Sequence, residues 1–372
     1  MAVAHGGAGG GRPGVIPLLP DEPRHVRAGE ELPLERLEAY LRASLPGVAG
    51  PVSAQQFPGG YSNLTYLVRA GDREWVLRRP PVGAAVRGGH DMLREYRLLS
   101  RLAPVYPKAP RPVAACEDAS VLGAPFYLME RVRGVILRRT TPPDDTLDVR
   151  ALSQSLVDTL VELHAVDVEA AGLTDLGRPE GYAKRQVQGW ISRWEASRGE
   201  AVPGIDATAA WLAGQSWPAA RPAIVHNDFK YDNVVLDPSD LSHVVAVLDW
   251  EMATLGDPLL DLGTSLAYWV DPDDPERWRR DALIDLTART GSLSRAEVAE
   301  RWASRLGRPL DALVAAYVFG VFKVAVIVQQ IYARYQRGLT TDPRFAELGA
   351  VVVSCGETAQ AAVAHGRIDR LG

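Results

Sequence analysis

Apolar residues follow different patterns in the two parts of the chain. Before about residue 132 they form short β-branched runs bounded by glycine and proline, which is the pattern of strands. The predicted strands are 65–68, 74–78, 113–116 and 126–132. Apolar residues three and four apart predict helices at 34–45 and 91–102, and this spacing dominates from residue 147 onward. The pattern predicts an α+β fold in which a small antiparallel sheet precedes a larger, mostly helical part.

One stretch of the second part breaks the helical spacing. Two β-branched runs, 234–236 and 244–248, flank a turn-like D-P-S-D sequence and therefore predict a hairpin. Asn233 enters the first strand and Asp249 leaves the second, so antiparallel pairing brings both to the same edge, with Asp228 a short loop away. Oxygen-bearing side chains gathered in this way suit a Mg²⁺–nucleotide site.

The order of these parts, H-x-D-x-x-x-x-N followed by a hairpin and an Asp, resembles the catalytic and metal loops of kinase-fold enzymes. The last Asp continues as D-W-E and then G-D-P-L-L-D-L, and no A-P-E segment follows. This variant is similar to the aminoglycoside phosphotransferase and choline kinase family. With the L-R-R-P-P segment, it is most similar to the phosphotransferase-like domains related to those fused to acyl-CoA dehydrogenases.

The resemblance runs from roughly Leu34 to Gly338 and implies a bilobal, protein-kinase-like fold. It divides the chain into a flexible N-terminal tail and lead-in (1–33), a nucleotide-binding N-lobe (34–132) and a C-lobe (133–372). The small antiparallel sheet belongs to the N-lobe, and the hairpin and the acceptor-binding helices belong to the C-lobe.

The resemblance also implies roles around the hairpin. Asp228 is expected to orient the substrate hydroxyl and accept its proton, and Lys230 to neutralise the γ-phosphate in transfer. Asn233 and Asp249 are expected to bind Mg²⁺. For Glu251, contact with metal, contact with substrate and simple solvation all stay open.

Four nearby residues are expected to be structural. His226 should tie the catalytic loop to the Asp249 segment, and Asp257 should cap the helix that follows it. Asp261, one turn into that helix, is expected to hydrogen-bond the catalytic loop. His164 lies near the end of another predicted helix and is expected to cap carbonyls there.

A glycine-containing segment before strand 65–68 suits nucleotide phosphates. Backbone N–H groups reach phosphate oxygens only where side chains are small, as at the residues Gly59, Gly60, Ser62 and Asn63. No lysine precedes Lys108, so the cation that holds the phosphates must be an arginine. Arg78 and Arg79 are the candidates. The V-L-cation order of the family selects Arg78, and strand alternation then turns Arg79 to solvent.

Two further elements complete the predicted nucleotide site. Glu95, at the edge of the apolar face of helix 91–102, resembles the helix-C glutamate that pairs with the strand cation in kinases. Strand 126–132 is expected to cross between the lobes. By resemblance, Met129 packs against adenine, and the backbone around Glu130 and Val132 hydrogen-bonds its edge.

Composition narrows the remaining choices. A chain of 372 residues suits two lobes, and its net charge of −5 without a Lys/Arg block disfavours nucleic acid as a partner. No cationic start followed by an apolar core is present in residues 1–20, and Cys116 and Cys355 are far apart, so a cytoplasmic protein is expected. The apolar stretch 313–331 carries Lys323 and two glutamines and is expected to be a buried helix, with no membrane contact. The oligomeric state stays open.

These features predict an ATP- and Mg²⁺-dependent phosphotransferase acting on a hydroxyl of a small molecule. The acceptor stays open among an antibiotic, an amino alcohol and a hydroxyacyl thioester. The tryptophan-rich region 181–217 is expected over the acceptor pocket, although helix packing explains it nearly as well. A nucleotide-binding pseudokinase would predict damage at Asp228 or Asp249, and both are intact. A protein kinase would predict the missing A-P-E segment.

Overall fold

Five short strands form one antiparallel sheet with the order β1-β2-β3-β5-β4. In the computed structural model they are β1 (Val52–Gln56), β2 (Leu64–Ala70), β3 (Arg73–Arg79), β4 (Pro112–Cys116) and β5 (Phe126–Glu130). Gly71 turns the chain from β2 into β3 at φ +61°, a left-handed conformation that suits a residue without Cβ. The four strands predicted from the apolar pattern are all present, with ends that differ by up to two residues.

The structure describes residues 22–58, 63–81, 91–138, 147–281, 286–340 and 342–372. Most of the predicted tail lies outside these ranges, as do Gly59, Gly60 and Ser62, so their phosphate contacts stay predictions. The lead-in from residue 22 is described, and Arg24 forms an isolated antiparallel bridge with Gln56 at the end of β1.

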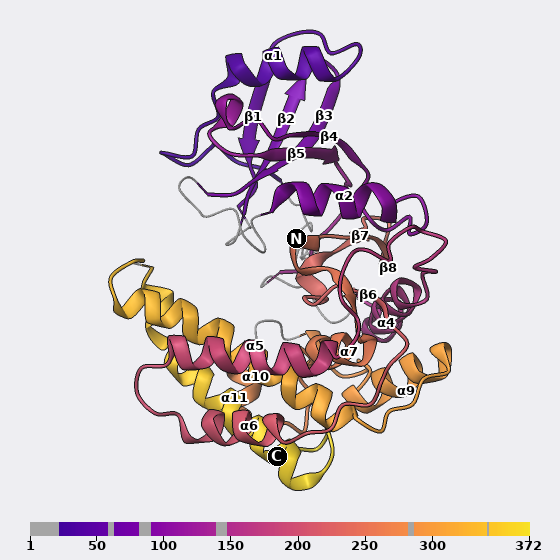
Figure 1. Cartoon of the computed structure of the whole chain (residues 1–372), viewed down its shortest axis with the longest axis vertical. Helices are drawn as coiled ribbons and strands as arrows, with labels where there is room; N and C mark the ends of the chain where they lie inside the picture. Colours follow the sequence, from indigo (N-terminus) through magenta and orange to yellow (C-terminus); the bar gives the residue numbers. More distant parts are fainter. Residues whose placement is uncertain (1–21, 59–62, 82–90, 139–146, 282–285, 341) are drawn as a thin grey trace, which may run out of the picture.

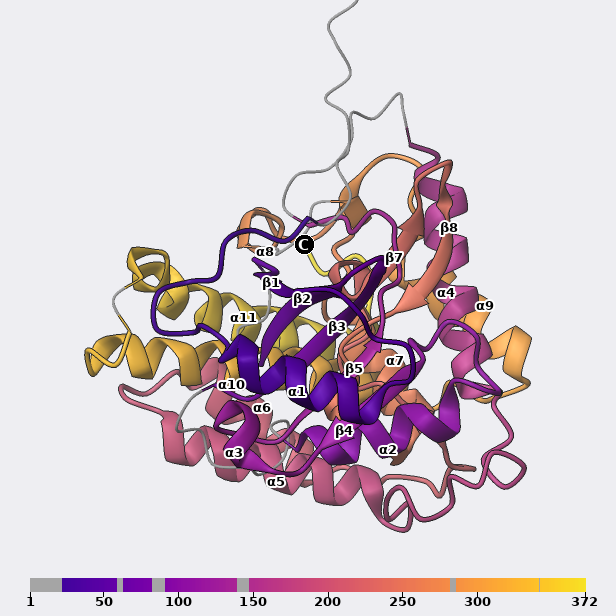
Figure 2. The ribbon, with the colours of Figure 1, turned by 90° about the horizontal axis from the view of Figure 1, so that it is seen from above.

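Helices cover both faces of this sheet. They are α1 (Leu34–Ser44), α2 (Met92–Leu102) and α3 (Ala119–Leu122). α1 and α3 lie on the face that carries Leu77, and α2 lies on the face that carries Val76. Figure 2 shows α1 extending across the strands. Because successive residues of a strand face opposite sides, Arg78 lies on the α2 side and Arg79 on the α1 side.

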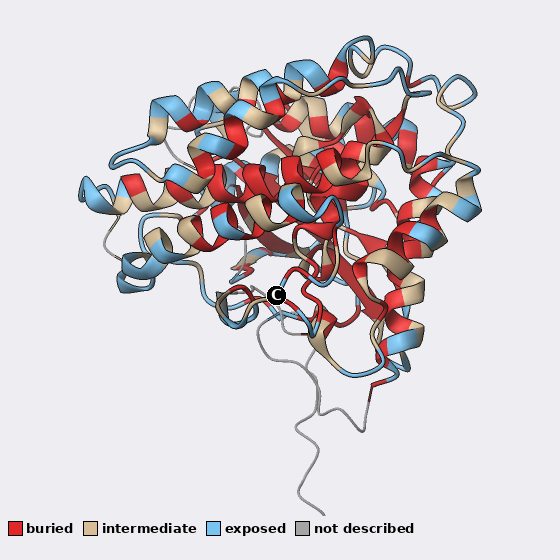
Figure 3. Ribbon diagram, turned by 90° about the horizontal axis from the view of Figure 1, so that it is seen from below, coloured by how far each residue is buried: buried red, intermediate tan, exposed pale blue. Residues whose placement is uncertain are grey.

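The larger part is mainly helical and lies below the sheet in Figure 1. Its helices are α4 (Val149–His164), α5 (Tyr182–Ser197), α6 (Pro203–Ala213), α7 (Pro258–Leu266), α8 (Glu276–Asp281), α9 (Arg295–Leu306), α10 (Leu313–Gln336) and α11 (Leu348–His365). Helices α5, α6, α10 and α11 pack together at the end far from the sheet. Figure 3, seen from below, shows buried residues gathered towards the centre of the molecule and exposed residues along its rim.

α10 is the core helix of this part, as its sequence predicted. Among the helices that the structure describes, it is the one long and apolar enough to cross a membrane, yet 72% of its apolar window is buried inside the protein. It packs against α5, α7 and α11. Lys323 lies near its middle and is buried as well.

The tryptophans of 181–217 mainly serve packing. Trp190 and Trp194 on α5 are buried in the main core, and Trp211 and Trp217 are partly buried against it. The Trp194 indole N–H also donates to Asp206 Oδ1 at 2.8 Å, which ties α5 to α6. The packing explanation therefore accounts for most of this aromatic density.

The predicted hairpin is confirmed as β7 (Val234–Asp237) paired with β8 (Asp240–Val247). A 3₁₀ turn, Tyr231–Asn233, leads into β7. A second antiparallel pair, β6 (Ala223–Val225) and β9 (Thr254–Gly256), brackets the hairpin in the sequence. β6 leads into residues 226–230, the loop of Asp228, which we call the catalytic loop after its predicted role. β9 leads into α7, so the short pair holds this loop beside the start of α7.

Two glycines let α7 and α10 meet backbone to backbone. A Cβ at Gly263 would lie 2.2 Å from the carbonyl oxygen of Ala316, and a Cβ at Gly320 would lie 2.2 Å from that of Gly263. Both distances are far below van der Waals contact, so neither position accepts a side chain without a shift of a helix. This contact, which we call the glycine seam, fixes α10 directly beneath the catalytic loop.

Candidate active site

The loop that carries Asp228 is held from below by the first turns of α7. Asp261 accepts hydrogen bonds from the backbone N–H groups of His226 and Asn227, each at 2.7 Å. Burial disfavours the charge of this carboxylate, but hydrogen bonds from the His164 side chain and the His226 backbone hold its pKa below the usual value. The predicted role of Asp261 is confirmed. Asp257 also caps α7 as predicted, accepting from the N–H of Leu259.

His226 joins the catalytic loop to the segment before Asp249. Its Nε2 lies 2.9 Å from the carbonyl oxygen of Leu248, and its Nδ1 accepts from the N–H of Asp228 at 3.3 Å. These contacts require a neutral ring protonated at Nε2, and complete burial lowers the pKa of His226 accordingly. The predicted linking role of His226 is confirmed.

Asp228 receives four side-chain hydrogen bonds on its carboxylate. Lys230 Nζ lies 2.9 Å from Oδ1 and 2.8 Å from Oδ2, and Asn233 Nδ2 donates to Oδ2 at 2.9 Å. The fourth bond comes from the Tyr268 hydroxyl, 3.0 Å from Oδ1. The Lys230 ammonium also lies 4.8 Å from the centre of the Tyr268 ring. The structure therefore brings together the three predicted residues and adds Tyr268.

Tyr268 was not predicted as a site residue, because its contact with Asp228 depends on where α7 lies against the loop. Ser265 and Tyr268 follow Asp261 by four and seven residues. This spacing places all three along one side of α7 and the turn after it. Ser265 Oγ donates to the carbonyl of Phe229 at 2.9 Å. All three residues therefore hold the catalytic loop, and this spacing is the signal that could have found Tyr268.

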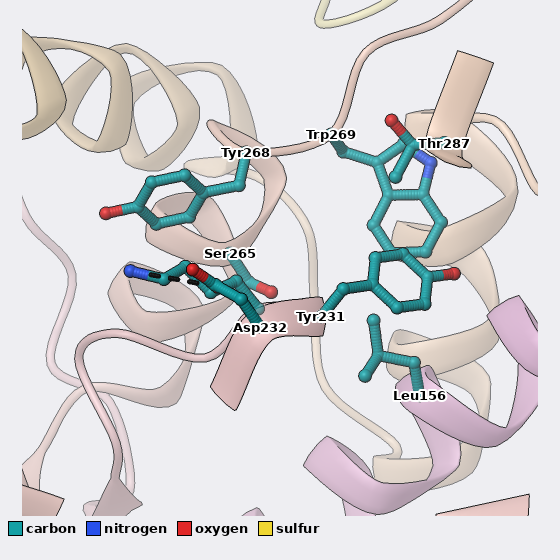
Figure 4. A pocket seen from close by; sticks show the side chains of 8 residues that line it. Leu156, Tyr231, Asp232, Ser265, Tyr268, Trp269 and Thr287 are labelled. Atoms are coloured by element: carbon teal, nitrogen blue, oxygen red, sulfur yellow. Dashed lines mark ion pairs between the residues drawn. The ribbon is translucent and has the colours of Figure 1, made fainter. Parts of the chain in front are cut away.

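A small pocket lies beside Lys230 and Tyr268 (Figure 4). Tyr231 and Asp232, from the turn before β7, line it together with Ser265. Burial raises the pKa of Asp232, and the nearby charge of Lys230 opposes that shift. This pocket belongs to the wall that supports the catalytic loop.

Asn233 and Asp249 meet at the same edge of the hairpin, as predicted. The N–H of Leu248 donates to the Asn233 carbonyl at 2.8 Å, which places the two side chains in the same cleft. Asp249 has φ +66°, an unusual backbone conformation for a residue with a side chain. Burial opposes its charge, but Arg78 lies close enough to lower its pKa.

Arg78 connects the sheet to this edge. Its Nη1 donates to Glu95 Oε1 at 2.6 Å, and its Nη2 donates to Asp249 Oδ1 at 2.9 Å. The predicted pairing with Glu95 is therefore present. Glu251 Oε2 lies 3.4 Å from the same Nη2 and accepts from Asn63 Nδ2 at 2.6 Å. Glu251 is thus part of the polar cluster and is not merely solvated.

Two predictions about neighbouring residues are wrong. Arg79 does not face solvent: it is 3% exposed, and its Nη1 donates to the Leu122 carbonyl at 2.7 Å, because α3 covers that face of the sheet. His164 does not cap carbonyls. Its Nε2 lies 3.1 Å from Asp261 Oδ2, and its Nδ1 accepts from the Trp302 indole at 2.9 Å.

The cleft between the two parts contains about 950 Å³ of empty space, part of which is open to solvent. Its lining includes Phe57, Val76, Arg78, Met129, Glu130, Val132, Asn233 and Asp249. The predicted nucleotide residues of β3 and β5 therefore face the same cleft as the predicted metal residues. The N–H of Glu130 already donates to the Arg111 carbonyl at 2.8 Å, so it is not available to a ligand.

These features define a kinase-like class of protein: a five-stranded sheet above a helical part, an arginine–glutamate pair, and a cleft edged by Asn and Asp. The chain belongs to the Phosphotransferase enzyme family, whose profile matches residues 53–317. Membership makes it a transferase of the kinase type.

Curated relatives of the chain are much longer proteins. Acyl-CoA dehydrogenase family member 10 of Mus musculus is 34% identical over 341 residues, which cover 90% of this chain and 32% of that protein. Acyl-CoA dehydrogenase family member 11 of Rattus norvegicus is 34% identical over 316 residues, covering 82% and 40%. The chain therefore spans a third to two fifths of these relatives.

Solved structures show the same fold. A putative aminoglycoside phosphotransferase from Ralstonia eutropha is 30% identical with a TM-score of 0.75, over 90% of this chain and 99% of that one. A thermostable mutant of aminoglycoside phosphotransferase APH(4)-Ia is 19% identical with a TM-score of 0.54, over 86% and 98%. That protein was solved as a ternary complex with AMP-PNP and hygromycin B. At this identity the likeness concerns the fold alone.

Proposed function

We propose that the chain is an ATP- and Mg²⁺-dependent kinase that transfers the γ-phosphate to a hydroxyl of a small molecule. One observation carries the proposal: Arg78 bridges Glu95 of α2 and Asp249 at the edge of the hairpin, so the phosphate cation and the metal carboxylate meet at one point. Asn233 joins this edge to Asp228 through its hydrogen bond at 2.9 Å. Phosphoryl transfer depends mainly on such positioning and charge neutralisation.

The cleft residues fit a nucleotide. Arg78 lines the cleft, and its guanidinium presents paired donors of the kind that bind phosphate oxygens. Met129 and the backbone at Glu130 and Val132 would hold adenine at the other end of the cleft. Because the Glu130 N–H is already bonded, its carbonyl and the backbone of Val132 are left for that contact.

The donor set also fits Mg²⁺. Within the described ranges, no group of three His, Cys, Asp or Glu residues is arranged to hold a metal ion. Mg²⁺ in phosphotransferases needs only one or two protein oxygens, because phosphates and water complete its shell. Asn233 and Asp249 would supply these oxygens. The bound ion would neutralise charge on the phosphates.

Asp228 and Lys230 would act on the transferred group. Asp228 orients the acceptor hydroxyl and takes its proton, while Lys230 neutralises the phosphate. Lys230 now bonds both oxygens of Asp228 with two of its three N–H donors, so one donor is left for a phosphate.

Among the three acceptor classes we favour a hydroxyacyl thioester. The relatives at 34% identity are named as acyl-CoA dehydrogenase family members, and a kinase domain in the same polypeptide would act on related molecules. An antibiotic and an amino alcohol are the alternatives to test beside it. We also propose a cytoplasmic location, because Mg·ATP is available there.

The test measures ADP release with Mg·ATP and three acceptors: 3-hydroxybutyryl-CoA, hygromycin B and choline. Asp228→Asn should lower kcat by about 10²–10⁴ while nucleotide binding persists, because it removes the proton acceptor. Asp240→Asn, at an exposed position on β8, is the matched control and should keep full activity. Wild-type protein that binds Mg·ATP without transfer to any acceptor would contradict the proposal and favour a pseudokinase.

A further inference from the structure

Lys323 is a buried cation that the chemistry described above does not use. It is 2% exposed near the middle of α10, and its ammonium donates a hydrogen bond to the carbonyl oxygen of Asn227. It also lies 5.5 Å from the centre of the Trp190 ring on α5. None of the described carboxylates comes within salt-bridge distance of it. Buried lysines are rare unless paired, so this arrangement needs a cause.

The partner of Lys323 is the residue immediately before Asp228. Asn227 has φ +65°, in the left-handed region that residues with side chains seldom adopt. All its polar groups are bonded. Besides the bond from Lys323 to its carbonyl, its N–H donates to Asp261. Its Oδ1 accepts from the Tyr182 hydroxyl at 3.0 Å, and its Nδ2 donates to the Met252 carbonyl at 3.1 Å.

The carbonyl that Lys323 holds belongs to the peptide unit joining Asn227 to Asp228. The N–H of that same unit donates to His226 at a long 3.3 Å, so the stronger restraint on the peptide plane comes from the carbonyl side. The orientation of this plane sets where the Asp228 side chain begins. Lys323 therefore acts on Asp228 through the backbone.

Holding the ammonium there disfavours the folded state. Burial lowers the pKa of Lys323 to about 8, with Asp228 and Asp261 opposing this shift and Lys230 and Arg193 adding to it. An apolar side chain would fill the same place on α10 without that cost. A residue that costs stability and touches the catalytic loop fits a functional position better than a packing position.

We propose that Lys323 is a positioning residue for phosphoryl transfer, holding the strained Asn227–Asp228 peptide so that the Asp228 carboxylate meets the acceptor hydroxyl. The inference rests on the proposed function and assigns a further residue to the same site. The glycine seam places α10 close enough to the loop for this contact.

The experiment compares Lys323→Met with Lys323→Gln, which keeps an N–H donor without the charge. Lys323→Met should lower kcat about 10- to 100-fold, because small misplacements of a reacting group have effects of this size. The KM for ATP and for the acceptor should change less than about twofold, since no binding contact is lost. Lys323→Gln should recover much of kcat, and the thermal midpoint of Lys323→Met should equal or exceed that of the wild type.

Gln329→Met is the matched control. Gln329 lies on the same helix, is buried, and donates its side-chain N–H to the Ser197 carbonyl at 3.2 Å, far along the chain from the catalytic loop. It should keep the wild-type kcat. An unchanged kcat in Lys323→Met would overturn the inference, as would a selective rise in KM or a loss of folding in both Lys323 variants. Failure of the wild type itself to release ADP with any acceptor would instead overturn the proposed function.

Discussion

Two consecutive arginines on β3 have opposite environments. Arg78 reaches Glu95 and Asp249 in the cleft, whereas Arg79 bonds the Leu122 carbonyl beneath α3. Strand alternation predicted that they would face opposite sides, and this is confirmed. The sequence did not show that the second side is covered, because the four residues of α3 are too few to display a helical period.

We expect methionine substitutions to separate the two roles. Arg78→Met should lower kcat/KM for ATP several-fold to a hundredfold, since a charged hydrogen bond in a buried site contributes roughly 1.5–3 kcal/mol. Arg78→Lys should recover only part, because an ammonium lacks the paired donors of a guanidinium. Steady-state kinetics at saturating acceptor measure this.

Arg79→Met serves as the control and should behave differently. It leaves the Leu122 carbonyl without its donor, which should lower the free energy of unfolding by about 1–3 kcal/mol while kcat/KM stays near the wild type. Urea unfolding measures the first quantity. If Arg79→Met impaired ATP use and left stability unchanged, the assignment of Arg78 to the phosphates would be wrong.

At the scale of elements, α7 organises the catalytic loop. The cap at Asp257 and the loop contact of Asp261 were both predicted. The G-D-P sequence marks a helix start at Asp257, and Asp261 lies one turn into that helix. The contact of Tyr268 with Asp228 was not predicted. It depends on where α7 ends and how it meets the loop, and local sequence does not determine that.

Tyr268→Phe tests this face of α7. Loss of the hydroxyl removes one hydrogen bond from Asp228, so kcat should fall by about three- to tenfold, as expected for one hydrogen bond of roughly 0.5–1.5 kcal/mol. Tyr231→Phe is the matched control, since its hydroxyl is buried and has no partner among the described residues. It should leave kcat unchanged. Equal effects in both variants would indicate a general packing effect.

Asp261 should also control the acid stability of the protein. Its folded pKa lies below the unfolded value of 3.8, so its stabilising contribution is fully present above about pH 3.8 and is lost as pH falls through the folded pKa. Asp261→Asn should therefore lower stability at pH 7 and flatten the fall in stability on acidification below pH 4. Chemical unfolding from pH 3 to pH 7 checks both. If Asp261→Asn still lost stability steeply below pH 4, the acid sensitivity would come from other carboxylates.

For the molecule as a whole, a few of the described side chains connect the sheet and α2 to the segment that follows the hairpin. Arg78 is one, and Asn63 bonds Glu251 at 2.6 Å. Arg94 of α2 donates to the Ala253 carbonyl at 2.5 Å. The relative placement of the lobes could not be predicted, because these contacts join residues more than 150 positions apart, and a single sequence carries no signal for such pairs.

A ligand that occupies the cleft between the lobes should therefore stabilise the whole chain. Mg·ATP at 100 times its Kd should raise the free energy of unfolding by about 2.7 kcal/mol, which appears as a higher Tm. EDTA, or the variant Asp249→Ala, should remove most of this shift, because the proposed Mg²⁺ would link the phosphates to the hairpin. If ATP with EDTA raised the Tm as much as Mg·ATP does, Asn233 and Asp249 would not bind metal.

The glycine seam has a consequence for how this scaffold can change. Gly263 and Gly320 leave no room for even one methyl group, so the distance from α10 to the catalytic loop is fixed by backbone alone. The outer surfaces of α5, α6 and α11 carry no such restriction and can vary without moving Asp228. Substitutions that preserve activity should therefore accumulate on those surfaces and be rare at the seam. A variant library that changes the outer surfaces of α5, α6 and α11 and keeps both glycines should contain more active members than a library that changes Gly263 and Gly320 and keeps those surfaces.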